Sequence, residues 1–298
     1  MIMNRLTMLA VTLMASIACF AQGNGKMATS LINQPHAQGD IVDLYELRYY
    51  IVAVEGDILS LEVIGFASDI TGTVGAVYGD PGDPDKVTDL YEGVLEIPSN
   101  YPASEVGFKC QITSIAENAF TATTCRNDDT KYKSKFADAA ALVNKILISY
   151  DAEFPNAITI GDNAFGSFTC VKQSDGTLTG LTEVENQTPG DKVAAISASS
   201  FATSVYKSAT LKTPEKVMGK YTSKEGWKRF LKITDGSILL GDIDGNGSIN
   251  ALDVAKFNKA YKTGVWTGLN KDAVDMNSDG TIAAVEYAQF CKRYKEFY

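Results

Sequence analysis

The chain has 298 residues, of which 45% are hydrophobic and 21% charged, so it is suited to about two folded domains with apolar cores. Its formal net charge of −9 and isoelectric point near 4.8 argue against a basic surface for binding nucleic acid. The single histidine, His36, removes histidine-based zinc sites and Ser-His-Asp or Cys-His nucleophiles. Hydrolysis by a pair of carboxylates stays open, because the chain has 36 acidic residues.

The amino-terminal segment has the pattern of a cleaved signal peptide. Arg5 precedes an apolar run that ends near Phe20, and the small side chains of Cys19 and Ala21 suit cleavage before Gln22. The run is shorter than the roughly 20 residues of a membrane-spanning helix. We therefore predict a secreted or cell-surface protein with no transmembrane segment in the mature chain. A lipid anchor on Cys19 is the minor alternative.

Four further cysteines, Cys110, Cys125, Cys170 and Cys291, lack the spacing of a metal site. An oxidising compartment permits disulfides, but four cysteines are too sparse for a disulfide scaffold. Buried or unpaired thiols are therefore the first interpretation, and Cys110–Cys125 is the one candidate bridge.

Three segments in the middle of the chain share a pattern in which an isoleucine precedes a phenylalanine by five residues. They are ITSIAENAF (112–120), ITIGDNAF (158–165) and VAAISASSF (193–201). A short strand would bury each isoleucine, the small polar residues would turn the chain, and the phenylalanine would pack under the next coil. Because one such unit cannot bury its own face, the units are expected to stack as a solenoid. On the pattern alone, an ordinary β domain with recurrent turns is an equal alternative.

The I-x-x-I-x-x-x-A-F pattern and its G-D-N-A-F variant resemble the BspA-like leucine-rich repeats of bacterial surface proteins. Residues 48–66 and 94–102 are similar to the strand-rich segment that precedes such repeats, and residues 209–233 to the segment that closes them. The resemblance implies a mainly β leucine-rich-repeat solenoid with a strand-rich N-terminal cap. It also implies a surface or secreted protein that adheres to host proteins or other cells.

Residues 242–253 (DIDGNGSINALD) and 275–286 (DMNSDGTIAAVE) follow the pattern of twelve-residue calcium loops. Oxygen-bearing side chains stand at loop positions 1, 3, 5 and 12, because Ca²⁺ takes six to eight oxygen ligands. Gly247 and Gly280 stand at position 6 and allow the sharp turn that so short a loop needs.

The two calcium loops belong to a duplicated unit, and the second copy begins 33 residues after the first. After each loop, aromatic and aliphatic residues recur at i, i+3 and i+7, the spacing of one helix face. These residues are Val254, Phe257 and Tyr261 in the first copy and Tyr287, Phe290 and Tyr294 in the second.

This duplicated loop-and-helix pattern resembles the dockerin module, which binds two calcium ions and inserts into a cohesin partner on bacterial polysaccharide-degrading assemblies. The resemblance implies eleven calcium-ligating residues. In the first loop they are Asp242, Asp244, Asn246, Ser248 through its carbonyl, Asn250 and Asp253; in the second they are Asp275, Asn277, Asp279, Thr281 through its carbonyl, and Glu286.

The sequence departs from the dockerin pattern in two places. Ala283 stands where an asparagine is expected, so water is expected to supply that ligand. At loop positions 10 and 11, where many dockerins have Ser-Thr, this chain has Ala251-Leu252 and Ala284-Val285. The second departure favours a more apolar contact with any cohesin-like partner.

The predicted fold class is α+β overall, a β solenoid followed by a small all-α calcium-binding module. The predicted domains are a signal peptide (1–21), a flexible linker (22–39), a BspA-like leucine-rich repeat domain with a β-rich opening segment (40–234), and a dockerin-like module (235–298). We expect residues 236–298 to need calcium for order, and the repeat domain to melt independently of them.

The favoured function is a non-catalytic binding or adhesion protein that engages a protein or glycan ligand through its repeats and docks through the calcium module. The alternative is a non-catalytic component of a cohesin–dockerin complex that degrades polysaccharides. An enzyme with paired carboxylates in residues 40–234 ranks last, because no spacing there supports a catalytic pair.

Overall fold

The computed structural model describes residues 37–44, 47–66, 93–101, 109–121, 143–154 and 157–295. The predicted signal peptide, most of the predicted linker, His36 and Cys125 lie outside these ranges. Across the described ranges, no helix is both long enough and apolar enough to cross a membrane.

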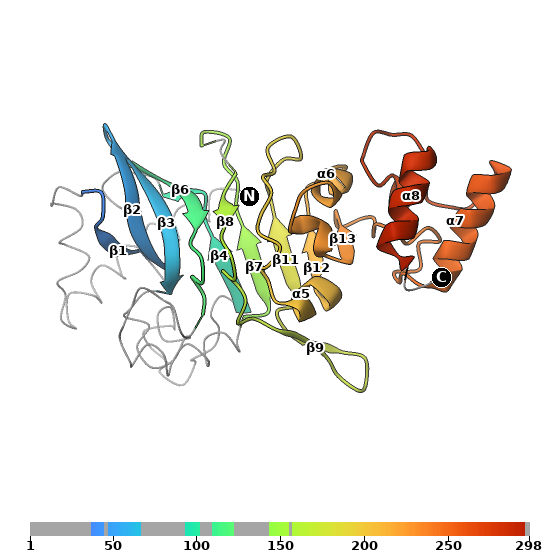
Figure 1. Cartoon of the computed structure of the whole chain (residues 1–298), viewed down its shortest axis with the longest axis horizontal. Helices are drawn as coiled ribbons and strands as arrows, with labels where there is room; N and C mark the ends of the chain where they lie inside the picture. Colours follow the sequence, from blue (N-terminus) through green and yellow to red (C-terminus); the bar gives the residue numbers. More distant parts are fainter. Residues whose placement is uncertain are drawn as a thin grey trace, which may run out of the picture.

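The described part of the chain is rich in strands and ends in a helical region, as predicted (Figure 1). The strands are β1 (Ile41–Leu44), β2 (Leu47–Glu55), β3 (Ile58–Phe66), β4 (Val94–Ile97), β5 (Asn100–Tyr101), β6 (Lys109–Ile115), β7 (Lys145–Ile148), β8 (Thr159–Ile160), β9 (Cys170–Lys172), β10 (Leu178–Gly180), β11 (Glu183–Asn186), β12 (Thr210–Lys212) and β13 (Lys232–Thr234). The helices are α5 (Thr203–Ser208), α6 (Met218–Thr222), α7 (Ala251–Thr263) and α8 (Ala284–Arg293), with 3₁₀ turns η2 (Trp227–Arg229) and η3 (Asp272–Val274).

The first sheet has the strand order β1-β2-β3-β6-β5, and β8 pairs with β6. Strands β1, β2 and β3 are antiparallel neighbours, and Leu47, Tyr49 and Ile51 of β2 alternate into the core. From β3 onward the pairing with β6 and then β8 is parallel. The sheet therefore changes from an antiparallel opening into a parallel stack where the first repeat unit begins.

The second sheet, in the order β4-β7-β11-β12-β13, is parallel throughout. One aliphatic residue from each strand falls in a single register row, and all five are fully buried: Leu95, Ile146, Val184, Leu211 and Ile233. Parallel neighbours cannot be joined by a tight hairpin, so the chain crosses over between successive strands. The repeat units lie in these crossover segments.

A column of phenylalanine rings links the repeat units. Successive ring centroids are 5.0 Å apart from Phe66 to Phe120, 5.2 Å to Phe165, 4.9 Å to Phe201 and 5.4 Å to Phe230. All five rings are buried; Phe120, Phe165 and Phe201 are stacked, and the rings at the two ends of the column make T-shaped contacts. The phenylalanines of the three units therefore pack against one another, and one further ring extends the column at each end.

The Asn-Ala-Phe that the first two units share has a backbone explanation. Asn118 and Asn163 have left-handed φ angles of 57° and 53°, which asparagine tolerates better than most residues. The side-chain amide of Asn163 donates to Oδ1 of Asn118 at 2.7 Å, which ties one turn to the next. In the third unit Ser199 takes this place and accepts the backbone N–H of Asn163 through its carbonyl at 3.1 Å.

The strand predicted in the third unit is wrong. Residues 193–200 are all described and none lies in a strand. Ile196 is still buried, but its backbone N–H donates to the carbonyl of Glu225 at 3.1 Å. The closing segment therefore takes the hydrogen bond that a neighbouring strand would otherwise make.

The thiols of Cys110 and Cys170 are buried, as the first interpretation of the cysteines predicted. The Sγ of Cys110 donates to the carbonyl of Tyr101 at 3.6 Å. Cys125 lies outside the described residues, so the candidate Cys110–Cys125 bridge stays a prediction.

The C-terminal helical region, residues 240–295, follows the last strand directly and shares its core. A bridge pairs Thr234 with Leu239, and the N–H of Gly241 donates to the carbonyl of Ala273 at 2.6 Å. A side chain at Gly241 would lie 2.5 Å from the ring of Tyr294, so glycine is required where the two parts meet. This continuity is at odds with the expectation that the two parts melt independently.

Replacing Phe165 by alanine should lower the free energy of unfolding by about 3–5 kcal/mol, because the change empties the middle of the phenylalanine column. Urea denaturation followed by circular dichroism measures this loss. Val171→Ala, on the 49% exposed Val171 of β9, is the control and should change stability by less than about 0.5 kcal/mol. Equal effects of the two changes would contradict the role given to the column.

Candidate metal centre

The first loop is held in shape by its own side chains. The carboxylate of Asp242 accepts the backbone N–H groups of Asn246 at 3.0 Å and Gly247 at 2.7 Å. Asp244 and Asn246 each accept an N–H two residues further on, at 3.2 Å and 2.9 Å. Gly247 has a φ of 82°, the left-handed turn that glycine at position 6 was predicted to supply. The acidic side chains therefore turn toward the centre of the loop.

The end of this loop is also the start of helix α7. The side chain of Asn250 accepts the N–H of Leu252 at 2.8 Å and caps the helix. The carboxylate of Asp253 accepts the N–H of Asn250 at 2.9 Å and that of Ile243 at 3.1 Å. Asp253 is fully buried and thus fixed between the helix and the loop.

Asp242, Asp244 and Asp253 bring one carboxylate oxygen each to within 4.8 Å of one another. Burial raises the pKa of Asp253, and the nearby charges of Asp244 and Asp242 raise it further. Three carboxylates this close repel one another unless a cation or a proton lies among them.

The second loop repeats this arrangement with Asp275, Asp279 and Glu286, whose oxygens also lie within 4.8 Å of one another. Asp275 accepts the N–H of Gly280 at 2.8 Å, as Asp242 does from Gly247. Glu286 is fully buried and accepts the N–H of Ala283 at 2.8 Å. The amide of Asn277 donates to Glu286 at 2.6 Å, which brings positions 3 and 12 of the loop together.

The structure thus gathers the six predicted carboxylates into two groups of three, one in each loop. Asn246 and Asn277 lie within these loops, and Asn250 serves the structure as a helix cap. Ser248 and Thr281 lie on the exposed rim of their loops, and their role as carbonyl ligands stays a prediction. Both donor sets consist of oxygen alone, which suits a hard cation such as Ca²⁺ and not a thiolate- or imidazole-seeking metal.

Comparison with known families identifies this region. Residues 240–293 match the dockerin type I domain. Dockerin type I domains bind calcium, which agrees with the donor chemistry of both loops. The predicted dockerin-like module is confirmed over these residues, and the predicted number of two ions stays a prediction.

Among solved structures, the crystal structure of the pneumococcal vaccine antigen PcpA is similar, with 15% sequence identity and a TM-score of 0.25. The match covers 60% of this chain and 46% of PcpA, so the chain spans less than half the length of that protein. No curated protein matches the chain.

Lys256 is a charged neighbour of the dockerin-like module's first loop that the sequence analysis missed. Its ammonium lies 2.6 Å from Oδ2 of Asp244 and lowers the pKa of that carboxyl. The equivalent residue of the second copy is Gln289, which is exposed. The two loops therefore differ in charge although their acidic groups match, and comparing the copies beyond position 12 would have revealed this difference.

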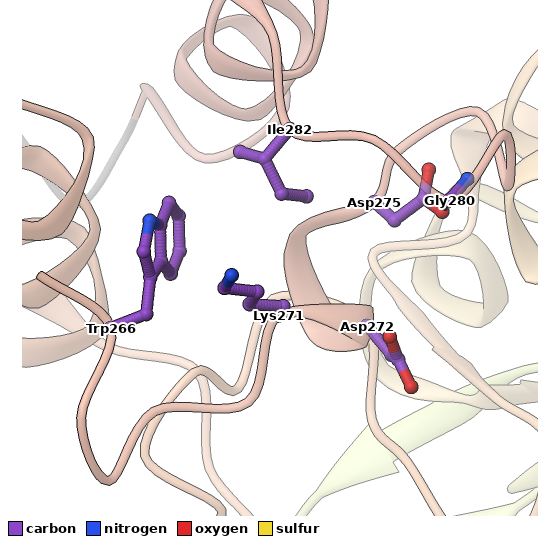
Figure 2. A pocket seen from close by; sticks show the side chains of 6 residues that line it. All are labelled: Trp266, Lys271, Asp272, Asp275, Gly280 and Ile282. Carbon is purple, nitrogen blue, oxygen red and sulfur yellow. Dashed lines mark hydrogen bonds between the residues drawn. The ribbon is translucent and has the colours of Figure 1, made fainter. Parts of the chain in front are cut away.

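A cavity of about 230 Å³ lies beside the second loop (Figure 2). Trp266, Lys271 and Ile282 line one part of it, and Asp275 and Gly280 of the loop line another. The Lys271 ammonium lies 5.6 Å from the centre of the Trp266 ring. The centres of the Trp266 and Phe257 rings are 5.9 Å apart. Trp266 thus packs onto helix α7.

Calcium binding to the first loop should weaken as the pH falls, and the weakening should begin at a higher pH than an ordinary aspartate would give. The raised pKa of Asp253 means that the calcium-free folded module holds this proton more tightly than the unfolded chain does. Without calcium the module therefore loses stability as the pH rises through this range, and calcium must displace the proton. Calcium titration calorimetry in two buffers of different ionisation enthalpy measures the proton release, and no release would contradict the assignment.

Lys256→Gln should raise the calcium affinity of the first loop roughly threefold, because it removes a positive charge beside the cation. Lys259→Gln, on an exposed residue of the same helix, removes the same charge away from the loop and should leave the affinity unchanged. Calcium titrations of the full chain distinguish the two variants. A lower affinity in Lys256→Gln would show that Lys256 instead helps to position Asp244.

Proposed function

We propose that the chain is a non-catalytic component of a cohesin–dockerin assembly, attached through its C-terminal module. The observation that carries this proposal is the coincidence of two oxygen-lined loops with the dockerin type I match at residues 240–293. A dockerin domain indicates a cohesin-binding module. The module is therefore the attachment device, and the strand-rich part is what it attaches.

The module has apolar side chains at the loop positions expected to meet a partner. Leu252 and Val285, at position 11 of the two loops, are 51% and 46% exposed. The preceding residues, Ala251 and Ala284, are also exposed and too small to shield them. An exposed aliphatic side chain next to a small residue gains free energy when a partner buries it. These features support an apolar contact with the cohesin-like partner.

The leucine-rich-repeat interpretation of residues 40–234 is the second part of the proposal. It is supported by the five in-register parallel strands of the second sheet and by the phenylalanine column between coils. The other face of these strands has a cluster of ion pairs. The ammonium of Lys145 lies 2.8 Å from the carboxylate of Glu183 and 2.6 Å from that of Glu185. The ammonium of Lys212 lies 3.2 Å from the same Glu185 carboxylate. This charged face is the candidate surface for a protein or glycan ligand, as in BspA-like surface proteins.

The location that fits this function is the cell exterior. Dockerin-bearing proteins are typically extracellular or at the cell surface, and the amino-terminal segment has the pattern of a signal peptide. An extracellular site would also supply calcium at concentrations that suit dissociation constants of about 10⁻⁴–10⁻³ M. Adhesion to host proteins or other cells is the alternative role of the repeat domain in such a setting.

Immobilised full-length chain should retain a cohesin-domain protein from the secretome of the source cells in calcium and release it in EGTA. The double change Leu252→Asp and Val285→Asp should weaken retention by on the order of tenfold or more, because it places charges in an apolar contact. Mass spectrometry of the eluate identifies the partner. Val171→Asp, which alters an equally exposed valine of β9, is the matched control and should retain the partner normally.

An eluate without a cohesin-domain protein, from a chain that still binds calcium, would contradict the attachment role and favour the adhesion role. Hydrolysis of a panel of plant and mucin glycans by the purified chain would contradict its non-catalytic assignment.

A further inference from the structure

The second calcium loop forms a joint with the strand-rich part of the chain. The N–H of Gly219 in helix α6 donates to the Oγ of Ser278 at 2.8 Å. The hydroxyl of Thr222, one turn further along α6, donates to the carbonyl of Met276 at 2.5 Å. Met276 and Ser278 are positions 2 and 4 of the loop, and they alternate with Asp275, Asn277 and Asp279, which face its acidic centre. One short segment thus has the acidic groups on one side and the joint on the other.

Contact at this joint is close enough to need a glycine. A side chain at Gly219 would lie 2.4 Å from the backbone of Asn277 and of Ser278. Gly219 lies within a short helix and has no left-handed φ angle, so its helix does not itself require glycine. The lack of a side chain at Gly219 is therefore explained by the approach of the loop.

Among the described residues, the first loop has no such hydrogen bonds with helix α6. Position 4 of the first loop is Gly245, which is exposed, and a side chain there would meet nothing within 4 Å. Helix α8, which follows the second loop, adds further contacts. The guanidinium of Arg293 donates to the carbonyls of Lys228 and Phe230, which belong to the strand-rich part. The two copies have therefore diverged, and the second packs against helix α6 and η2.

We propose that calcium in the second loop locks the dockerin-like module onto helix α6 and thereby stabilises the end of the strand-rich part. The three carboxylates of the empty loop repel one another, and relief of that repulsion by opening the loop would displace Met276 and Ser278 from α6. Filling the loop holds the same backbone in the conformation that makes both hydrogen bonds. The proposal rests on calcium binding by the module, and is independent of any cohesin partner.

The two tryptophans allow each part to be followed separately. Trp227 is buried in η2, beside the carbonyls that Arg293 contacts, and Trp266 belongs to the module. In full-length chain with Trp266→Phe, fluorescence reports on Trp227 alone. The midpoint of its thermal unfolding should rise by about 3–6 °C between EGTA and about 10 mM calcium.

Gly219→Ala separates the joint from the calcium site, because it changes no predicted ligand. In EGTA this variant should be as stable as the parent or more so, since alanine favours a helix over glycine. In calcium it should lose most of the rise in the Trp227 midpoint, while calorimetry still detects calcium binding. Thr222→Val removes the hydroxyl that bonds the carbonyl of Met276 across the joint and also lies 2.8 Å from the carbonyl of Gly219 within α6, so it should reduce the rise partly. Ser223→Ala, which removes the neighbouring hydroxyl that donates to the carbonyl of Lys220 in α6, should not reduce it.

Each outcome decides the proposal. If the chain binds calcium but the unfolding midpoint reported by Trp227 is the same in EGTA and in calcium, the proposed joint is overturned. The cohesin-binding role would not be affected. If the calcium-dependent rise of the Trp227 midpoint persists in both Gly219→Ala and Thr222→Val, calcium stabilises the strand-rich part through contacts other than the joint. This result would also overturn the proposal. Absence of calcium binding would overturn the metal centre, and with it both the joint and the attachment role.

Discussion

The crowding of three carboxylates in each loop is the constraint on which the C-terminal module depends. Asp253 and Glu286 are fully buried and fixed by backbone N–H groups, so neither can swing away from its acidic neighbours without breaking the start of a helix. Repulsion in the loop is therefore coupled to the stability of α7 and α8. Calcium is the partner that this geometry suits, and its effect extends to whatever packs against those helices.

The strand-rich part is subject to a different constraint, because each repeat unit is too small to have a core of its own. The row from Leu95 to Ile233 closes one side of the stack, and the phenylalanine column fills the space between the coils. Such a stack has an exposed apolar end unless something covers it. At the last strand, β13, the dockerin-like module lies in this position, next to Phe230 and η2 (Figure 1).

How much the sequence could predict depended on how far apart the interacting residues lie. The acidic groups of each loop lie within twelve residues, so their spacing alone predicts that the three carboxylates of a loop lie close together, as they do. Lys256 was missed because it lies beyond the loop, and only its contact with Asp244 marks it. The joint connects residues 54 and 59 positions apart, and no local pattern contains such a pairing. Likewise Phe66 and Phe230 join the column although neither follows the isoleucine pattern of the three units.

The joint changes what attachment through the module would mean. A module on a flexible tether would leave its cargo free to turn, whereas here a single core continues from the parallel sheet into helices α7 and α8. The apolar residues at position 11 of the two loops, Leu252 and Val285, are exposed. Positions 2 and 4 of the second loop, by contrast, are hydrogen-bonded to helix α6. A partner bound at those apolar residues would consequently hold the charged face of the parallel sheet in a fixed direction. Calcium would then set both whether the chain is attached and how this charged face is oriented.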